Sequence, residues 1–365
     1  MKADRAVDAN LNRAQEALRV LEDAARFILC DDAAAEKLKS LRHALHPFGD
    51  SLMNRLLTAR DSRGDGNAHL NPPTEMSREG LPALITANAK RAEQALRSLE
   101  EFAKLPNAIL RQKAATFKRI RFELYSLEEE LTGKVLRDDK KRLLHGLYVV
   151  LDPEISGGRD VTEIARPALA GGVRLIQLRD KQGTKSRKLE LCRELKAMAT
   201  QAGALFIVND EVDVTLLAEA DGVHLGQDDL PAKEVRGLLP VGVLIGVSTH
   251  NVSEAISAEK DGADYISVGC LFPTHSKKDV RPTSLKVLRE IRKAVRLPIV
   301  GIGGINSDNI AQVYEAGADM AAVISAVGLA EDPSEMIDLL SRDVLLHSRA
   351  SGPKLDGIKS STSAG

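Results

Sequence analysis

Eight short apolar runs recur between residues 147 and 325, and each is rich in residues that favour β-strands. Stretches with helical spacing, such as residues 184–202, separate them. Near-continuous apolar strands that alternate with helices predict a parallel sheet covered by helices. Eight such units in roughly 200 residues fit a compact (β/α)8 barrel, which we favour over an open doubly wound sheet because such sheets usually have fewer strands. The runs are LYVVLD (147–152), RLIQLRD (174–180), LFIVND (205–210), GVHLG (222–226), LIGVS (244–248), YISVG (265–269), PIVGIG (298–303) and MAAVIS (320–325).

The first third of the chain contains no comparable runs and instead carries a repeat. Residues 8–27 and 86–105 share the frame A-N-x-x-R-A-x-x-A-L-R-x-L-E. Apolar residues recur at helical spacing in the first copy, which predicts a helix with one buried stripe. Further helical sequence follows each copy, around 38–52 and 113–131. We therefore expect two related helix pairs in a small bundle with approximate twofold symmetry.

These two patterns divide the chain into parts of different class. We expect an all-α helical-bundle domain over 1–135, a charged linker over 136–146 and a (β/α)8 TIM barrel over 147–349. The fold class is therefore α/β with an added helical domain. Residues 350–365 are polar and rich in Gly and Ser, so we expect a disordered tail there.

Composition excludes several classes of function. A formal net charge of −1 gives no reason to expect nucleic acid or an acidic membrane surface as a partner. No stretch approaches the roughly 20 apolar residues that cross a bilayer, and no apolar run follows the first lysine as in a secretory signal. The three cysteines are far apart, which favours a reducing compartment over a disulfide framework or a zinc site. We therefore expect a cytoplasmic protein.

Basic side chains gather where these runs end, which is where a barrel of this class places its reactive groups. The second run ends in Gln177, Arg179 and Lys181, which share one face because side chains alternate along a strand. Arg179 can chelate phosphate oxygens through its planar guanidinium, and Lys181 and Lys277 would add point charges. Together these cations suit a diphosphate, whereas either lysine alone would more often be a solvated loop residue.

Acidic side chains follow the third and fourth runs. Asp210 and one of Asp228 or Asp229 lie at neighbouring strand ends, close enough to share a hard cation. Two carboxylates with water and substrate phosphate are a usual arrangement for Mg²⁺, and the alternative for each acid is a structural helix cap. His224 lies within the fourth run, and we interpret it as structural rather than as a ligand.

Glycines mark the end of the seventh run, GIGG at 301–304. They let the backbone approach a ligand closely, and the amides around the seventh and eighth strands form the usual phosphate site of such barrels. Ile324 and Ser325 end the eighth run at the same mouth. We therefore expect a second, monophosphate ligand, and a transfer reaction in which diphosphate leaves and the second molecule attacks.

The strand ends, taken in order over residues 145–345, closely resemble those of the thiamine phosphate synthase family. In that family, hydroxymethylpyrimidine diphosphate reacts with carboxythiazole phosphate to give thiamine phosphate and pyrophosphate, with loss of CO₂ from the carboxylated thiazole. The motifs that carry the resemblance are QLRDK, VND, ADGVHLGQDD, IGVSTH, PTHSKKD, PIVGIGGI and VISA.

The resemblance implies a role for each strand end. Asp210 and Asp229 would bind one Mg²⁺ per barrel, and Ser248 would lie near the pyrimidine. The residues that would hold the pyrimidine diphosphate are Gln177, Arg179, Lys181, Asn209 and Lys277. Those that would bind the thiazole phosphate are Thr274, Ser276, Gly303, Ile324 and Ser325. The catalytic residues would be Arg179, Lys181, Ser248 and Lys277.

The implied mechanism is dissociative, because diphosphate leaves before the thiazole nitrogen captures a pyrimidine methylene cation. Mg²⁺ and the basic residues would stabilise charge on the leaving diphosphate. The loop 271–282 is long for such a barrel and is expected to act as a lid. Ser276 stands where the family often has threonine, and the hydroxyl is kept. The main alternative is the related thiazole tautomerase, an isomerase on the same barrel that would not need the diphosphate and metal residues.

Residues 1–135 resemble the small domain fused to some thiamine phosphate synthases, a kinase that acts on hydroxymethylpyrimidine monophosphate. The resemblance rests on the repeat, on the segment ARDSRGD (59–65) and on the fusion itself, and it implies a nucleotide cofactor for which ATP is one candidate. Alternatively, the polar residues of the repeat bond each other and the bundle backbone, and the module only associates chains into a homo-oligomer. The candidates for the kinase site are Asn10, Arg13, Asn88 and Arg91 from the repeat, with Arg60, Asp61 and Asp65 from the segment.

Overall fold

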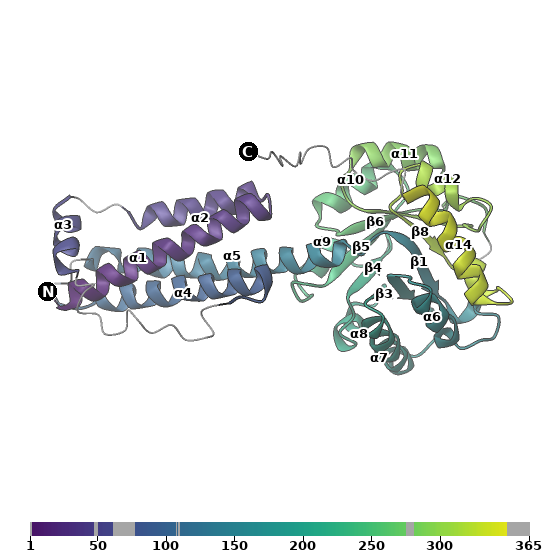
Figure 1. Ribbon diagram of the computed structural model, residues 1–365, viewed down its shortest axis with the longest axis horizontal. Coiled ribbons are helices and arrows are strands. Elements are labelled where there is room, and N and C mark those ends of the chain that lie inside the picture. Colours follow the sequence, from purple (N-terminus) through teal and green to yellow (C-terminus); the bar gives the residue numbers. More distant parts are fainter. Residues whose placement is uncertain are drawn as a thin grey trace, which may run out of the picture. The chain divides into compact units, whose positions relative to one another are not determined.

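The computed structural model describes residues 2–46, 50–60, 77–106, 108, 110–274 and 281–348 (Figure 1). The chain forms two compact units, Met1–Asp138 and Asp139–Gly365. Helix α5 (Ala114–Lys141) runs through the boundary, so the first half of the expected linker is helical. Within these described ranges, no helix is long and apolar enough to cross a membrane.

The N-terminal unit is helical throughout the part of it that the structure describes. The repeat forms α1 and α4, which pack against each other (Figure 1). The elements in order are α1 (Lys2–Asp23), the π-helical turn η1 (Ala24–Ile28), α2 (Asp32–Ala44), α3 (Asp50–Ala59), α4 (Gly80–Phe102), the 3-10 turn η3 (Arg111–Lys113) and α5.

The repeat helices pack through the predicted apolar stripe. Leu11, Ala14, Leu18 and Leu21 of α1 are all at most 4% exposed, and the matching residues of α4 are buried as well. Helical spacing places these side chains on one side of each helix, so burial of that side removes a continuous apolar surface from water. The sequence-based prediction of a buried stripe is confirmed.

The two copies of the repeat also make the same buried ion pair. Glu22 accepts a hydrogen bond from Arg42 Nε at 2.8 Å, and Glu100 accepts one from a terminal nitrogen of Arg121 at 3.0 Å. Both glutamates are 4% exposed. Each glutamate lies on a repeat helix and each arginine on the next long helix, α2 or α5. The internal repetition therefore extends from the sequence to the contacts that join each helix pair.

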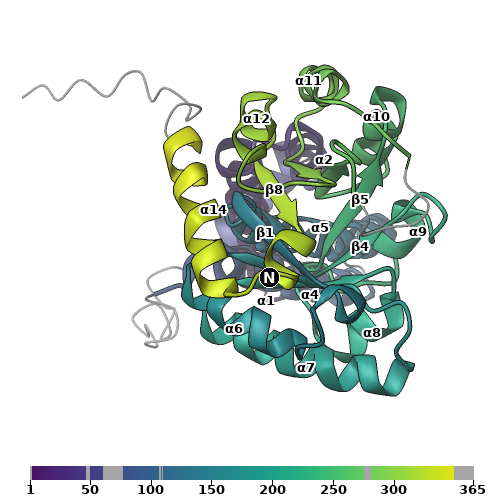
Figure 2. The same cartoon turned by 90° about the vertical axis from the view of Figure 1, so that its right-hand side faces the viewer.

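The C-terminal unit is a closed parallel barrel of eight strands in sequence order, as predicted, with helices around it (Figure 2). Its strands are β1 (Gly146–Leu151), β2 (Leu175–Leu178), β3 (Leu205–Asn209), β4 (Gly222–Leu225), β5 (Leu244–Thr249), β6 (Tyr265–Val268), β7 (Ile299–Ile302) and β8 (Met320–Val323). Its helices are η4 (Pro153–Ile155), α6 (Val161–Ala170), α7 (Lys185–Gln201), α8 (Val212–Leu217), α9 (Ala232–Arg236), α10 (Val252–Lys260), α11 (Leu285–Ala294), α12 (Ile310–Glu315), α13 (Ser325–Gly328) and α14 (Pro333–Ser348).

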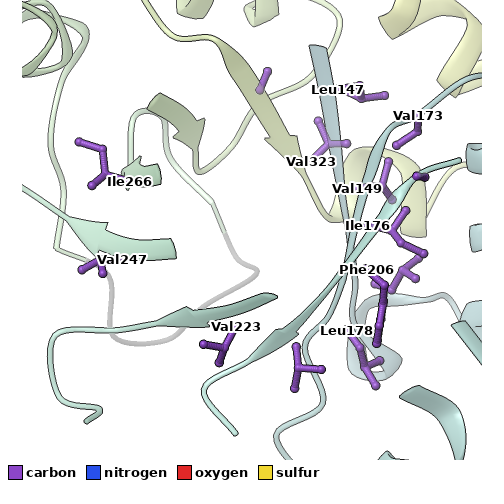
Figure 3. Close-up of a cluster of buried hydrophobic side chains, with 14 of the residues drawn as sticks. Leu147, Val149, Val173, Ile176, Leu178, Phe206, Val223, Val247, Ile266 and Val323 are labelled. Carbon is purple, nitrogen blue, oxygen red and sulfur yellow. The ribbon is translucent and has the colours of Figure 1, made fainter. Parts of the chain in front are cut away.

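Side chains alternate along the strands and form two cores. Outward-facing residues such as Ile176 and Phe206 pack beneath the helices, as Figure 3 shows. Inward-facing residues at the strand starts, including Leu175 and Met320, form a smaller core together with Leu144 just before β1. The barrel is thus filled at its amino-terminal end, and a cavity lies toward the carboxyl ends of the strands.

Three aspartates fix the strands at the filled end. Asp221, Asp264 and Asp319 directly precede β4, β6 and β8. Each accepts a hydrogen bond from a backbone amide near the start of β3, β5 and β7, at 3.1, 2.9 and 2.8 Å respectively. These bonds fix the register between neighbouring strands. They therefore also fix how far each strand extends at its carboxyl end.

Candidate active site

A cavity at the carboxyl ends of the strands takes residues from all eight of them. It brings together many of the residues predicted from the strand-end pattern, although they come from distant parts of the sequence. Those that line it are Gln177, Arg179, Asn209, Ser248, Thr274, Gly303, Ile324 and Ser325.

Arg179 reaches this cavity from the end of β2 and is held by an ion pair. Its guanidinium donates to the carboxylate of Asp152, which is 2% exposed and follows β1. Asp152 also accepts a hydrogen bond from the Glu154 amide at 3.0 Å. The sequence analysis did not predict Asp152 as a site residue, although it ends the run LYVVLD and the strand-end pattern could have found it.

Lys181 lies beside the cavity, where its ammonium donates to the carboxylate of Asp210. Asp210 follows β3 with a left-handed backbone, φ +62°. Such a conformation is uncommon for a residue with a side chain and marks a position to examine for function. Burial and the neighbouring Asp210 carboxylate both raise the pKa of Asp229, while a hydrogen bond from the Gly226 amide at 2.7 Å opposes the rise.

The adjacent carboxylates of Asp210 and Asp229 suit a hard divalent cation. Over the described residues, no group of three or more His, Cys, Asp or Glu side chains could hold a metal ion. The protein would therefore supply two oxygen donors and leave the remaining positions to water and phosphate, an arrangement that fits Mg²⁺ better than zinc. None of these contacts involves Asp228.

Glycines at the end of β7 shape the opposite side of the cavity. Gly303 and Gly304 have left-handed backbones, with φ of +102° and +63°. A Cβ atom at Gly303 would lie 2.4 Å from Cys270 Sγ, and one at Gly304 would lie 2.4 Å from the Pro273 carbonyl oxygen. Only glycine fits both positions, which leaves bare backbone lining the cavity together with Ser325.

Several predicted residues lie outside the described residues. They are Ser276 and Lys277 with most of the expected lid, Asp61 and Asp65, and the tail from 350 onward. Their roles stay predictions.

A buried polar layer lies beneath the mouth of the cavity. His224 Nε2 lies 3.0 Å from Ser248 Oγ, and its Nδ1 lies 3.2 Å from the Tyr265 hydroxyl. The Tyr265 hydroxyl lies 3.2 Å from that of Tyr148, which accepts a hydrogen bond from Gln177 Nε2 at 2.6 Å. Sequence analysis interpreted His224 as structural and did not predict either tyrosine, although strand alternation places them on the same inward face as Gln177 and Ser248.

The candidate residues of the helical unit are placed in two different ways. Asn10 and Asn88 each donate to the backbone carbonyl four residues earlier, at 2.8 and 2.9 Å. Arg60 donates to the Asp8 carboxylate at 2.8 Å. Arg13 and Arg91 are exposed, and neither makes a hydrogen bond or ion pair with another described residue. The asparagines thus have a structural explanation, whereas the two repeated arginines have none.

The closed barrel and the polar cavity at its strand ends define a protein of the (β/α)8 class. Residues 147–327 match the family model described as thiamine monophosphate synthase, and residues 5–130 match the ThiD2 family. The thiamine-phosphate synthase of Synechococcus sp. (strain CC9311) is 40% identical over 338 residues, covering 92% of this chain and 94% of that protein. The corresponding protein of Gloeobacter violaceus is 40% identical over 329 residues, covering 90% of this chain and 93% of its own length.

A solved structure agrees with these similarities for the barrel. The thiamine phosphate pyrophosphorylase from Pyrococcus furiosus is 39% identical, with a TM-score of 0.53, and covers 58% of this chain and 99% of its own. The chain belongs to the thiamine-phosphate synthase family, whose members are transferases. Its relatives match across both units, which confirms the expected fusion of a synthase barrel with a second, helical part.

Proposed function

We propose that the barrel condenses hydroxymethylpyrimidine diphosphate with carboxythiazole phosphate to give thiamine phosphate, pyrophosphate and CO₂. The observation that carries this proposal is the convergence, in one cavity, of a wall that carries Arg179 and a glycine-lined wall at Gly303 and Gly304. Lys181, Asp210 and Asp229 lie beside the Arg179 wall. A site for one phosphorylated ligand would not need both walls.

Arg179, Lys181 and Asn209 hold the diphosphate of the pyrimidine substrate. The guanidinium of Arg179 is fixed by Asp152 and so needs little reorganisation as charge develops on the leaving group. Mg²⁺ held by Asp210 and Asp229 would neutralise part of that charge. Gln177 and Ser248 face the same cavity and orient the pyrimidine ring.

The thiazole phosphate binds at the other wall, where the backbone at Gly303 and Gly304 meets Ser325. This position aims the thiazole nitrogen at the pyrimidine methylene carbon. Val150, Val300 and Ala322 form apolar parts of the cavity. These side chains exclude water that would otherwise capture the pyrimidine cation before the thiazole does.

Product analysis tests this reaction. Purified protein with Mg²⁺ and both substrates is expected to form thiamine phosphate and pyrophosphate in equal amounts. Arg179→Ala is expected to lower kcat/KM about a hundredfold or more, because it removes charge stabilisation at the leaving group. The matched control Arg187→Ala, at an exposed arginine that pairs with Glu190 on α7, should retain wild-type activity. Isomerisation of the thiazole phosphate without condensation would instead establish the tautomerase alternative.

We also propose that residues 1–135 phosphorylate hydroxymethylpyrimidine monophosphate with ATP and so supply the barrel with its diphosphate substrate. Support comes from the ThiD2 match and from Arg13 and Arg91. These arginines recur in both copies of the repeat, remain exposed and have no structural partner among the described residues. An arginine fork of this kind suits the phosphates of either substrate.

Kinase activity and association give different results in one set of variants. Arg13→Ala and Arg91→Ala are each expected to lower ATP-dependent diphosphate formation about tenfold or more, with unchanged oligomer size in sedimentation. Arg119→Ala, at an exposed arginine paired with Glu123, is the control. Unchanged kinase activity together with altered oligomer size would show that the helical part is an association module.

A further inference from the structure

The buried polar layer separates the apolar floor of the barrel from its mouth. Tyr148, His224 and Ser267 line the cavity and are at most 7% exposed, and Tyr265 beneath them is fully buried. The barrel leaves space for this layer at Gly246, where a Cβ atom would lie 2.1 Å from the Tyr265 ring and 2.5 Å from His224 Nδ1. A polar layer this deep needs every donor and acceptor to be matched.

We propose that this layer is a one-way hydrogen-bond relay from Gln177 to Ser248, and that it makes the cavity specific for an aminopyrimidine over the corresponding oxopyrimidine. The inference rests on the proposed function, in which Gln177 and Ser248 orient the pyrimidine ring. Tyr148, Tyr265 and His224 act here as positioning residues.

The direction of the relay begins at Gln177. Its amide nitrogen donates to the Tyr148 hydroxyl oxygen at 2.6 Å. Burial raises the pKa of both Tyr148 and Tyr265, so each phenol keeps its single hydrogen. Tyr148 therefore accepts from Gln177 and donates to its other partner, the Tyr265 hydroxyl at 3.2 Å.

The second half of the relay fixes the histidine tautomer. Tyr265 is 0% exposed, and its hydroxyl has two partners, Tyr148 and His224 Nδ1. Since Tyr265 accepts from Tyr148, it donates to Nδ1, and Nδ1 is an acceptor. The neutral imidazole then carries its hydrogen on Nε2.

The relay ends at Ser248. His224 Nε2 donates toward Ser248 Oγ at 3.0 Å or Ser267 Oγ at 3.2 Å, and Ser267 donates to Ser248 at 3.4 Å. Along each of these contacts Ser248 accepts a hydrogen bond within the layer, which leaves its own hydroxyl hydrogen available to a ligand in the cavity that it lines. At the other end, the amide nitrogen of Gln177 is bonded to Tyr148, which leaves Oε1 as the acceptor that this residue can offer.

The cavity thus offers one acceptor at Gln177 and one donor at Ser248. A 4-aminopyrimidine presents the complementary pair, an exocyclic N–H donor next to a ring nitrogen acceptor. The 4-oxo form presents the reverse pair, and its carbonyl acceptor would meet the Gln177 acceptor. Turning the Gln177 amide around would not relieve this clash, because Oε1 would then face a Tyr148 hydroxyl whose single hydrogen is already donated to Tyr265, so the layer resists adaptation to the wrong ring.

Substrate discrimination in phenylalanine variants tests the relay. We expect Tyr265→Phe and Tyr148→Phe to lower, about tenfold or more, the kcat/KM ratio for the amino substrate over its oxo analogue. The KM for the pyrimidine diphosphate should rise, and the KM for the thiazole phosphate should stay constant. Tyr314→Phe is the control. It removes a hydroxyl that lies away from the cavity and donates a 2.8 Å hydrogen bond to the Gly146 carbonyl, so it should change neither the discrimination ratio nor the KM for the pyrimidine diphosphate.

An unchanged discrimination ratio in both folded variants would overturn the relay. A second measurement, ¹⁵N NMR of histidine-labelled protein, does not depend on the reaction. The His224 signals are assigned as those that are missing from the spectrum of the His224→Gln variant. The relay requires an unprotonated Nδ1 at His224 in the wild type, and a protonated Nδ1 would contradict it. Absence of product with an unprotonated Nδ1 would overturn the proposed function and leave the direction of the relay standing.

Discussion

At the residue scale, the barrel mouth fixes its charges before any ligand arrives. Arg179 is held by the buried Asp152, and Lys181 by Asp210. Such pairing keeps cationic side chains from folding back onto the surface, while the partner carboxylates limit how strongly the site attracts unrelated anions. A ligand with several negative charges and a divalent cation can compete for both partners at once.

The choice between Asp228 and Asp229 gives a direct prediction at this scale. Asp229→Asn is expected to lower activity about a hundredfold and to raise the Mg²⁺ concentration needed for half-maximal rate, because one of two metal ligands loses its charge. Asp228→Asn is the matched control and should keep the wild-type Mg²⁺ dependence. Titration of initial rates with Mg²⁺ measures both, and the reverse order of effects would contradict the assignment.

Glu100 gives a prediction about pH. Burial alone would raise its pKa, but hydrogen bonds from Arg121, Arg97 and Lys104 outweigh burial and hold the pKa below its ordinary value. Its contribution to stability is therefore complete above the ordinary carboxyl pKa of about 4.3 and is lost as pH falls through the lower value in the folded state.

Glu100→Gln should accordingly destabilise the protein at neutral pH, by about 2 kcal/mol or more, and make unfolding less sensitive to acid. Urea unfolding followed by circular dichroism, at about pH 7 and at about pH 3.5, measures both effects. Glu123→Gln, at an exposed pair with Arg119, should change little. Equal acid sensitivity in Glu100→Gln and the wild type would refute the assignment.

Strand alternation and the strand-end rule predicted part of the cavity lining, because both follow from backbone geometry alone. Gln177, Arg179 and Ser248 are on the predicted face for that reason. Tyr148 and Tyr265 were missed because a tyrosine in a strand is usually part of an apolar core, and only the three-dimensional register brings their hydroxyls together. Which inward-facing side chains form hydrogen bonds across the barrel depends on the register between strands, and the sequence of one strand does not reveal that register.

At the element scale, all eight strands form where the apolar runs predict them. The helical sequence around 38–52 divides instead into α2, which ends at Ala44, and α3, which begins at Asp50. The sequence places Pro47 between them, and proline disfavours helical geometry in the residue before it. The π-helical turn η1 has no comparable sequence signal, because it departs from the α-helix only in hydrogen-bond spacing.

Strand β5 carries a prediction that belongs to this scale. Gly246→Ala would place a methyl group against Tyr265 and His224, and should destabilise the barrel by about 1–3 kcal/mol while raising the KM for the pyrimidine substrate. Gly237→Ala is the control, because its Cβ would lie 3.5 Å from the nearest atom, an ordinary contact. Urea unfolding and steady-state kinetics measure the two effects, and a neutral Gly246→Ala would show that the layer is not tightly packed.

At the scale of the whole molecule, two units with separate cores share one chain. The fusion is chemically reasonable if the product of one unit is the substrate of the other. The relatives from Synechococcus and Gloeobacter match across both units, so they share the pairing with this chain. The proposed division of labour requires that each unit can be inactivated without loss of the other activity.

Independence of the two units is therefore the prediction at this scale. Arg91→Ala should lower synthesis from the pyrimidine monophosphate and ATP about tenfold or more, yet leave synthesis from the diphosphate at the wild-type rate. Arg179→Ala should block both, because the barrel acts last. Thiamine phosphate formed from each starting substrate measures these effects, and loss of both activities in folded Arg91→Ala would contradict the separation of the sites.

The most direct test of the account measures thiamine phosphate formed by the wild-type chain in two parallel reactions with Mg²⁺ and carboxythiazole phosphate. One reaction contains the pyrimidine diphosphate, and the other contains the pyrimidine monophosphate with ATP. The account predicts product in both, with one pyrophosphate released per thiamine phosphate in the first. Product in the first reaction alone would remove the kinase from the account, and no product in either with folded protein would contradict the synthase assignment itself.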